Sequence, residues 1–417
     1  MKAIDDAIHD GVDVLSLSIV NLLGAPPRIS CGGKGYTRGI CSWELWTGQS
    51  LFADMERANQ LHNIKLYMNS ILASAVVNNG GEGFIFTQQN ADLLVAWQFR
   101  AMSIPCVSID LEVAYKIIQY FSTSQNPVAK VSLSRTTTGS GFPDPKIAAF
   151  SSRGPSSVYP AVLKPDIAAP GVNILAAAPQ VGIYKELGLY FFDSGTSMAC
   201  PHVSGIIAML KSLHPDWSPA AFKSALMTTD RGFAAYITDN NGLPLLADAT
   251  PNKIADPFDY GAGFVNPTQA SDPGLIYDTD ASDYQKLFNC MYGSDTNGSC
   301  IATEKSLFDL NLPSIAIPNL KSSETVSRTV TNVGQVDAVY KAFVEPPAGV
   351  DMLVKPMVLV FGKDTSSQSF KVSFKATRKI QGDYTFGNLV WHDGGRHWVR
   401  IPIAVHVVIE DLYSTVS

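Results

Sequence analysis

The hydrophobic pattern of this 417-residue chain changes its period near residue 308, and that change limits the folds it can adopt. From there on, short apolar runs such as SRTVTNVG, VYKAFVE, SFKVSFKA and VRIPIAVHVV follow one another with turns between them. Short strands at such intervals are typical of an all-β sandwich. The preceding residues mix helical and strand patterns, which is typical of an α/β fold. The sequence therefore predicts an α/β part followed by a β-sandwich over 308–417.

Composition excludes several classes of protein. With 46% hydrophobic residues the chain can bury sizeable cores, so a mainly disordered protein is excluded. A formal net charge of −6 and a pI near 5.6 give no basis for a nucleic-acid partner or an anionic membrane surface. No stretch approaches the roughly 18 uninterrupted apolar residues of a membrane span. We expect a soluble globular protein of two or three domains, and its oligomeric state stays open.

Cysteine spacing and acidic spacing give no sign of a metal site. The six cysteines form no C-x-x-C pair, and no acidic cluster has the spacing of a calcium loop, so we expect neither a metal nor a cofactor. Cys290 and Cys300 bracket a polar loop that a disulfide could close in an oxidising compartment. Asn297 begins a glycosylation sequon in that loop. The N-terminal MKAIDDAIHDG is amphipathic and is not a signal peptide, so the chain is cytosolic or lacks its leader.

Coarse patterns divide the α/β part. A helix over about 4–8 feeds the apolar strand VDVLSLSI, whereas residues from about 20 to 60 show no sustained period. From about 61 to 135 strand and helix patterns return. IPCVSID is predicted as a strand and LEVAYKIIQYF as a helix with Val113, Ile117 and Tyr120 on one face.

The segment DSGTSMACPHVSGIIAMLKSLHPDW is the most informative of the chain. One apolar stripe at helical spacing comprises Val203, Ile206, Ile207, Leu210 and Leu213. The pattern predicts a helix from near Ser197 to His214, with Pro201 in its first turn. Gly195 is expected to allow a sharp turn before the helix. Ser218 and Pro219 are predicted to begin a second helix as N-cap and first residue.

Ser197 has two interpretations from physics alone. At the start of a helix its hydroxyl and its own N–H face a field that favours negative charge. An acyl-transfer nucleophile needs such a field, because the attacked carbonyl becomes an oxyanion. A serine at this position is more often a plain helix cap.

The surrounding string decides between these interpretations. The sequence G-T-S-M-A-C-P-H-V-S-G is similar to the nucleophile motif of the subtilisin-like serine proteases. Three further stretches resemble recurrent segments of that family, in the same order: SSRGP at 151–155, LKPDIAAPGVNI at 163–174 and YGAGFVNPTQASDPGLIYD at 260–278. The chain resembles the plant subtilases best.

The resemblance implies a domain organisation. Residues 1–60 would be an N-terminal fragment of the catalytic domain plus an irregular junction, and 61–135 an inserted protease-associated domain. Residues 136–290 would be the C-terminal half of the catalytic domain, with part of its parallel sheet. Residues 308–417 would be a fibronectin-III-like sandwich.

The resemblance also implies an activity. Ser197 would be the nucleophile of a serine endopeptidase acting on polypeptide substrates, and Ser18 would lie in the substrate-binding segment. Family members are usually extracellular, in the apoplast or cell wall.

The other two members of the catalytic triad have no counterpart in this sequence. The family carries an Asp in an Asp-Thr-Gly-type turn and a His in a His-Gly-Thr-type helix, and neither string occurs here. Five residues after Ser197 on the same helix, His202 faces another side and matches the family motif as a structural residue. Surface or structural roles are assigned to the remaining histidines and to three turn or strand-end aspartates: His9, His62, His214, His392, His397, His406, Asp13, Asp144 and Asp166. Asn78 and Asn79 lie in the insert-like region and are not taken as the oxyanion-hole residue.

Two functional hypotheses therefore stay open. One is a subtilisin-like endopeptidase, impaired because the triad Asp and His are absent. The other is a catalytically silent subtilase remnant that serves as a binding or structural module. An unrelated serine hydrolase gains no support, because no G-x-S-x-G elbow occurs.

Overall fold

The computed structural model describes twelve stretches of the chain: residues 84–87, 106–109, 111–125, 127–128, 146–157, 159–181, 188–229, 244–247, 253–280, 282–284, 307–377 and 383–408. Four residues with a predicted role lie outside the described stretches: Ser18, Cys290, Asn297 and Cys300. Contacts divide the chain into two units, one containing 144–169 and 199–417 and the other 19–143 and 170–198. Each unit is described by itself.

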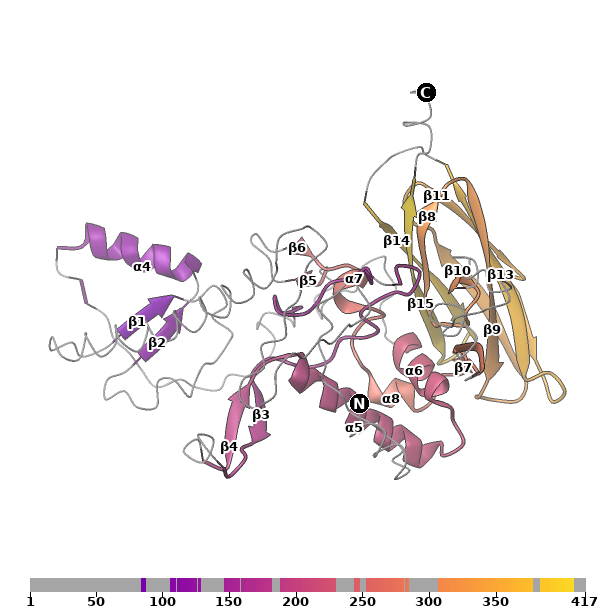
Figure 1. Ribbon diagram of the computed structural model, residues 1–417, viewed down its shortest axis with the longest axis horizontal. Helices are drawn as coiled ribbons and strands as arrows, with labels where there is room; N and C mark the ends of the chain where they lie inside the picture. Colours follow the sequence, from indigo (N-terminus) through magenta and orange to yellow (C-terminus); the bar gives the residue numbers. More distant parts are fainter. Residues whose placement is uncertain are drawn as a thin grey trace, which may run out of the picture. The chain divides into compact units, whose positions relative to one another are not determined.

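A β-sandwich occupies the C-terminal part of the first unit (Figure 1). Its strands after residue 307 are β8 (Ile315–Leu320), β9 (Ser323–Asn332), β10 (Ala338–Glu345), β11 (Val350–Lys355), β12 (Val358–Phe361), β13 (Ser367–Ala376), β14 (Thr385–His392) and β15 (Trp398–Val407). One sheet has the order β12–β10–β14–β15–β8. All its pairs are antiparallel except β15 with β8. The predicted all-β part is confirmed.

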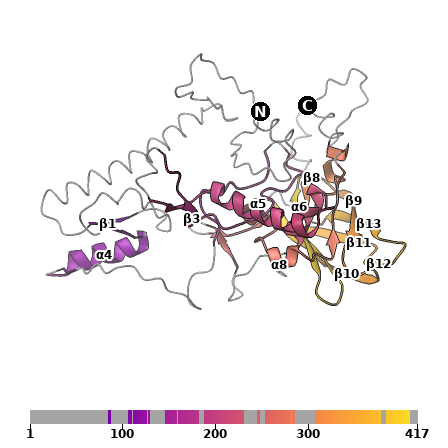
Figure 2. The ribbon, with the colours of Figure 1, turned by 90° about the horizontal axis from the view of Figure 1, so that it is seen from below.

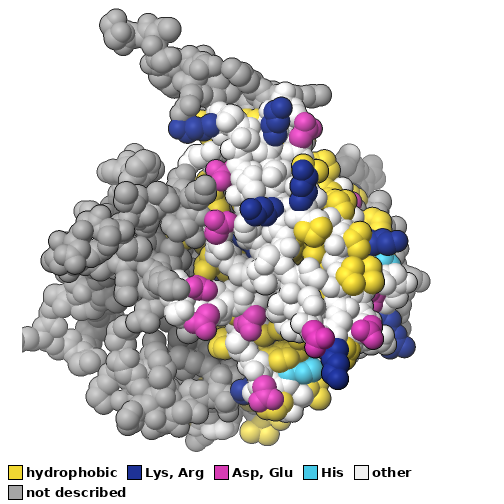
Figure 3. All heavy atoms as spheres, turned by 90° about the vertical axis from the view of Figure 1, so that its right-hand side faces the viewer, with side chains coloured by type: hydrophobic (Ala, Val, Ile, Leu, Met, Phe, Trp, Pro, Cys, Tyr) yellow, Lys and Arg dark blue, Asp and Glu magenta, His cyan; other side chains and the backbone are white. Residues whose placement is uncertain are grey.

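Alternation along the strands separates the sandwich core from its surface. Trp391, Tyr340, Phe370 and Phe374 are among its fully buried side chains, and the ring of Trp391 meets that of Phe370 edge-on at 4.9 Å. Edge-on packing of this kind adds to the free energy gained by burial. Hydroxyl groups pair across β9 and β13 at 2.8–2.9 Å, in the pairs Thr325–Ser373, Thr329–Ser369 and Thr331–Ser367. Uncharged polar groups and backbone cover much of the described surface in Figure 3.

The second sheet takes one strand from upstream of residue 308. It has the order β11–β13–β9–β7, and β7 (Leu275–Ile276) pairs antiparallel with the end of β9. Leu275 and Tyr277 are fully buried in the sandwich core. The polypeptide before the expected boundary at 308 therefore completes this sheet.

Two helices, labelled α5 (Thr196–Leu213) and α6 (Pro219–Thr228) in Figure 2, contribute most of a small hydrophobic core that also includes Ala270, and the first unit takes the first of them from Ala199 on. The helix α5 carries Val203, Ile206, Ile207 and Leu210 toward α6. The predicted bounds of the first helix are confirmed. Leu213 departs from the predicted stripe, because its side chain is 60% exposed at the C-terminal end.

The start of α6 follows the sequence prediction in detail. Ser218 is its N-cap and accepts the Ala221 N–H at 3.0 Å, with Pro219 as the first helical residue. The hydroxyl of Ser218 also donates to the carboxylate of Asp278. Capping satisfies an N–H group that has no partner inside the helix.

Shorter elements complete the first unit. They are β5 (Leu246–Ala247), β6 (Lys253–Ile254), α7 (Pro257–Tyr260) and α8 (Pro267–Ala270). The strands β5 and β6 pair antiparallel. Parallel pairing in the described part of 146–284 is limited to the isolated bridges Ile147–Ala247 and Ala168–Phe264, so the expected parallel sheet is not seen in these residues.

The second unit contains elements of the expected 61–135 region. The strand β1 (Phe84–Thr87) pairs in parallel with β2 (Cys106–Ile109), and α4 (Leu111–Thr123) follows. The predicted strand and helix are confirmed. The helix exposes Val113, Ile117 and Tyr120, at 37–47% of their surface. Among the described residues, no helix is both long and apolar enough to cross a bilayer.

Candidate active site

A pair of strands leads the chain into the helix that carries Ser197. The strands β3 (Ile174–Ala177) and β4 (Tyr190–Asp193) pair antiparallel, and two residues separate β4 from α5. The hydroxyl of Ser194 accepts the Asn173 N–H at 2.8 Å, and the Gly195 N–H donates to the Gly171 carbonyl at 2.8 Å. Asn173 takes a left-handed φ of 52°, which asparagine tolerates better than most residues. These bonds fix the turn that precedes the helix.

Ser197 is the second residue of α5 and is exposed. The N–H of the following Met198 donates to the Gly195 carbonyl at 3.0 Å, which closes the first turn. The serine therefore lies inside the helix and not at the N-cap position. An exposed hydroxyl in the first turn, where backbone N–H groups favour negative charge, has the access and the field that an acyl-transfer nucleophile needs.

The chain bends at Gly195 just before the helix, as expected, but the local backbone does not require a glycine there. Its φ is not in the left-handed region, and a Cβ placed on it would meet no atom closer than 3.6 Å, namely the Ser197 backbone N. The local backbone therefore accommodates an alanine at this position. Any need for glycine must come from outside the fold of this turn, such as the approach of a substrate.

Pro201 lies deeper in the helix than the sequence predicted. Because α5 begins at Thr196, Pro201 is its sixth residue and stands inside the helix. Proline has no N–H, so it does not supply the usual hydrogen bond to the carbonyl four residues earlier, which is that of Ser197. The backbone immediately after the candidate nucleophile thus departs from a regular helical ladder.

The described histidines lie in three places. His202 is half-buried on α5. His214 follows the end of α5, where its Nε2 lies 2.9 Å from the Ser271 carbonyl and its ring stacks on Trp217. The remaining three belong to the sandwich: His392, His397 and His406.

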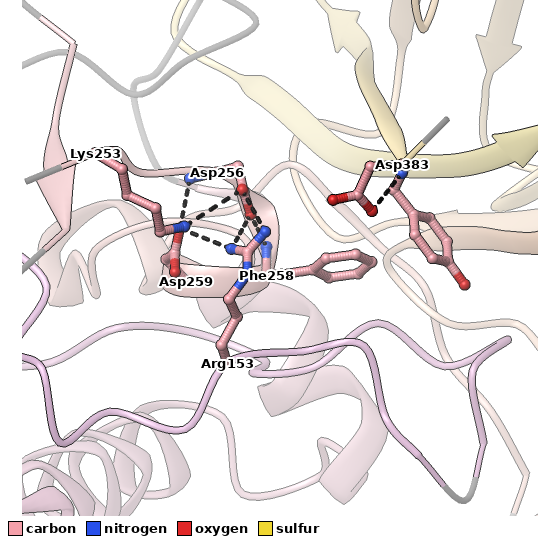
Figure 4. Close-up of polar contacts among 7 residues, drawn as sticks. Arg153, Lys253, Asp256, Phe258, Asp259 and Asp383 are labelled. Atoms are coloured by element: carbon pink, nitrogen blue, oxygen red, sulfur yellow. Dashed lines mark hydrogen bonds and ion pairs between the residues drawn. The ribbon is translucent and has the colours of Figure 1, made fainter. Parts of the chain in front are cut away.

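A cluster of charged side chains joins the SSRGP motif to residues just before the YGAGF motif (Figure 4). Arg153, from SSRGP, donates two hydrogen bonds of 2.6 Å to Asp256 and lies 2.8 Å from Asp259. Lys253 contacts Asp259 from the other side at 2.5 Å. Asp256 and Asp259 also form a capping box at the N-terminus of α7. The cluster therefore holds the 151–155 loop against the helix that precedes the YGAGF segment.

The aromatic ring in the middle of α7 extends this cluster toward the sandwich. The guanidinium of Arg153 lies 5.6 Å from the centroid of the Phe258 ring, and that ring meets Tyr384 and Phe386 edge-on. Burial opposes the charged form of Arg153, but the two carboxylates outweigh this effect and raise its pKa. No local sequence pattern predicts these ion pairs, although SSRGP itself identifies the loop.

Asp166, from the LKPD motif, is a structural anion. Its carboxylate lies 2.7 Å from the Lys164 ammonium and 2.9 Å from that of Lys223 on α6. Burial favours the neutral acid, yet the ammonium groups of Lys223 and Lys164 prevail and hold the pKa of Asp166 below 3.8. Its carbonyl accepts the Ala262 N–H at 2.9 Å. These contacts agree with the exclusion of Asp166 as a triad acid.

The site region offers no metal cluster in its described residues. No group of three or more histidine, cysteine, aspartate or glutamate side chains is arranged to hold a metal ion within the stretches that the structure describes. The chemistry argued for Ser197 uses none.

Comparisons with known proteins give matches along most of the chain. The Subtilase family matches residues 1–263, and the Fibronectin type-III domain matches residues 309–405. Subtilisin-like protease SBT3.9 of Arabidopsis thaliana is 38% identical over 495 aligned residues, covering 99% of this chain and 64% of its own length. SBT3.12 of the same plant is 47% identical, covering 98% of this chain and 62% of its own. SBT3.3 is 46% identical, covering 99% and 64%.

The extent of these matches settles the family. The subtilase match covers more than half of the chain, while the chain spans less than two-thirds of the length of these relatives. The fold consists of a subtilase region followed by a strand-rich fibronectin type-III domain. On these grounds the chain belongs to the subtilase family of serine proteases.

Proposed function

We propose that this chain carries the nucleophile half of a subtilisin-like serine endopeptidase, with Ser197 forming the acyl-enzyme. The exposed position of Ser197 in the first turn of α5 carries the proposal. The hydroxyl would attack a peptide carbonyl while the backbone N–H of Ser197 helps to hold the oxyanion. The substrate would be a polypeptide.

Turnover is proposed to be impaired. A serine hydroxyl is a weak nucleophile unless a neighbouring base takes its proton, and the sequence contains neither an Asp-Thr-Gly nor a His-Gly-Thr string. Removing triad members lowers kcat by about four to six orders of magnitude in serine proteases. We therefore expect slow reaction of Ser197 with electrophiles and little peptide hydrolysis.

A fluorophosphonate probe tests the nucleophile directly. Labelling of the full chain that disappears in Ser197→Ala would support the proposal. Ser212→Ala is the matched control, because Ser212 is another exposed serine on the same helix, bonded to the Met209 carbonyl at 2.7 Å. Labelling that persists in Ser197→Ala, or no labelling at all, would contradict the proposal.

The second candidate function is a silent binding or structural module. The observation that favours it is the intact sandwich, whose core is complete in the described residues without any catalytic group. If wild-type protein gives no Ser197-dependent labelling while the sandwich is folded, this alternative replaces the first.

The finer features inferred from the sequence are proposed as well. We propose a protease-associated insert over 61–135, supported by the β1–β2 pair and α4. We propose domain limits of 1–60, 136–290 and 308–417 for the other parts, with a parallel sheet in the catalytic domain.

The secretory features rest on family resemblance and on the sequence itself. We propose an extracellular location, a disulfide between Cys290 and Cys300, glycosylation at Asn297, and a role for Ser18 in substrate binding. A mass shift on enzymatic deglycosylation that is absent in Asn297→Gln would support the glycan, and no shift in wild type would contradict it.

A further inference from the structure

One histidine lies between two carboxylates that come from different parts of the first unit. His397, at the start of the β15 region, is 13% exposed. Its Nδ1 lies 2.6 Å from Asp393 in the β14–β15 turn, and its Nε2 lies 3.1 Å from Asp272, just after α8. Asp272 belongs to the segment between the subtilase and fibronectin matches, whereas Asp393 belongs to the fibronectin domain. The imidazole therefore connects the linking segment to the sandwich.

Tight packing fixes the ring in this position. Gly274 has a φ of 75°, and a Cβ on it would lie 2.5 Å from the Tyr340 hydroxyl and 2.8 Å from the His397 Cβ. The Gly274 carbonyl accepts the Val333 N–H at 2.9 Å, next to the pairing of β7 with β9. The linking segment thus passes directly against the imidazole next to its pairing with β9.

The two contacts of the imidazole do not respond equally to loss of a proton. Asp393 is held in place by the N–H groups of Gly395 at 2.7 Å and of His397 at 3.1 Å, in addition to the ring. A neutral imidazole has a single N–H, which stays on Nδ1 facing this fixed carboxylate. The Nε2 lone pair would then face Asp272, and an attraction would become a repulsion.

The other groups near the ring do not take over its role. Tyr340 of β10 stays protonated, because burial and the nearby Asp393 and Asp272 raise its pKa. His392 of β14 faces elsewhere: its Nδ1 accepts the Gly394 N–H at 3.2 Å and its ring stacks on Trp398.

The remaining charge in this turn is Arg396, which is exposed to solvent. Burial alone would lower the pKa of His397, but the interactions with Asp393 and Asp272 raise it above its ordinary value of 6.5. The imidazolium is therefore the form that matches this site.

We propose that His397 is a proton-dependent latch that holds the linking segment at Asp272 to the β14–β15 turn of the sandwich in acidic solution and releases it as the pH rises. The contact is complete below about pH 6.5, the unfolded-state pKa, and is lost as the pH rises through the higher folded-state value. The latch concerns the joint between domains and is independent of acylation at Ser197.

Hydrogen exchange on the full chain tests the latch. Protection of the peptide covering 271–277, corrected for intrinsic exchange rates, is compared at about pH 5.5 and about pH 8. We expect severalfold greater protection at the lower pH in the wild type, and no such difference in Asp272→Asn. Asp364→Asn, at an exposed carboxylate of the fibronectin domain, serves as the control and should keep the wild-type difference.

A second variant separates the latch from general stability. His397→Asn should also abolish the pH difference. If that variant fails to fold, Asp272→Asn still tests the proposal, because the Asp272 side chain is 60% exposed and its replacement should be tolerated. Equal protection at both pH values in the wild type would overturn the proposal. A pH difference that survives in Asp272→Asn would overturn it as well.

Discussion

Arg153 and Asp256 stand 103 positions apart in the sequence, yet two hydrogen bonds of 2.6 Å join the guanidinium to the carboxylate. This bidentate pair fixes the SSRGP loop to the helix α7. Because Asp259 is only 6% exposed and shares the same guanidinium, the pair belongs to a network and not to an isolated surface bridge.

Replacing the guanidinium by an ammonium tests this network. Arg153→Lys keeps the positive charge but loses the planar guanidinium that bonds both carboxylate oxygens. We therefore expect the free energy of unfolding, measured in urea, to fall by about 0.5–1.5 kcal/mol. The estimate is modest because the Arg153 side chain is 37% exposed. Arg396→Lys, at an exposed arginine of the sandwich, is the control and should change stability little. Equal urea midpoints for the two variants would count against the network.

Two glycines are expected to respond in opposite ways to alanine. A Cβ on Gly154 would lie 2.1 Å from the Lys164 carbonyl oxygen and 2.9 Å from the Phe258 ring, whereas one on Gly195 would fit. Gly154→Ala should therefore lower stability by about 1–3 kcal/mol, or prevent folding, while Gly195→Ala should melt like wild type. Thermal unfolding followed by circular dichroism measures both. A larger loss for Gly195→Ala than for Gly154→Ala would contradict the described turn.

Arg328 offers a test inside the sandwich. It is 3% exposed and donates to the carbonyls of Phe308, Leu312 and Ser314 at 2.5–3.0 Å. Burial lowers its pKa to about 10, so it is still charged at neutral pH. Arg328→Met would leave these carbonyls without their donor and should cost about 3 kcal/mol or more. Chemical denaturation should rank this loss above that of Arg153→Lys, and the reverse order would be evidence against it.

Asp166 should govern part of the stability in acid. Because its folded-state pKa lies below 3.8, its ion pairs with Lys164 and Lys223 stabilise the fold above that pH. The contribution is lost as the pH falls through the folded-state pKa. Asp166→Asn should therefore be less stable than wild type near neutral pH, and the difference should shrink in strong acid. A constant difference across urea titrations from about pH 7 to about pH 2 would refute this assignment.

Local signals in the sequence predicted the helices well. Ser218 and Pro219 identified the start of α6, because capping depends on residues within one turn. The apolar stripe gave the bounds of α5. Leu213 was misplaced: it lies in the last turn of α5, where its side chain is 60% exposed.

Long-range features were not accessible in the same way. The two-residue strand β7 has no periodicity of its own and exists through pairing with β9. The cluster of Arg153, Asp256 and Asp259 depends on loops brought together by the fold. Ser197 was identified because its motif is contiguous, while the geometry around it added its exposure and the tolerance of Gly195 for a side chain.

The pairing of β7 with β9 has a consequence for how the two regions can be separated. A recombinant sandwich that starts at 308 would leave the end of β9 unpaired and would remove Leu275 and Tyr277 from its interior. Such a fragment would offer an open strand edge and a hole beneath it, both of which promote self-association. A fragment that starts upstream of 275 would keep β7 paired with β9. The fibronectin domain can therefore be separated as a closed sandwich only together with the residues that precede it from β7 on.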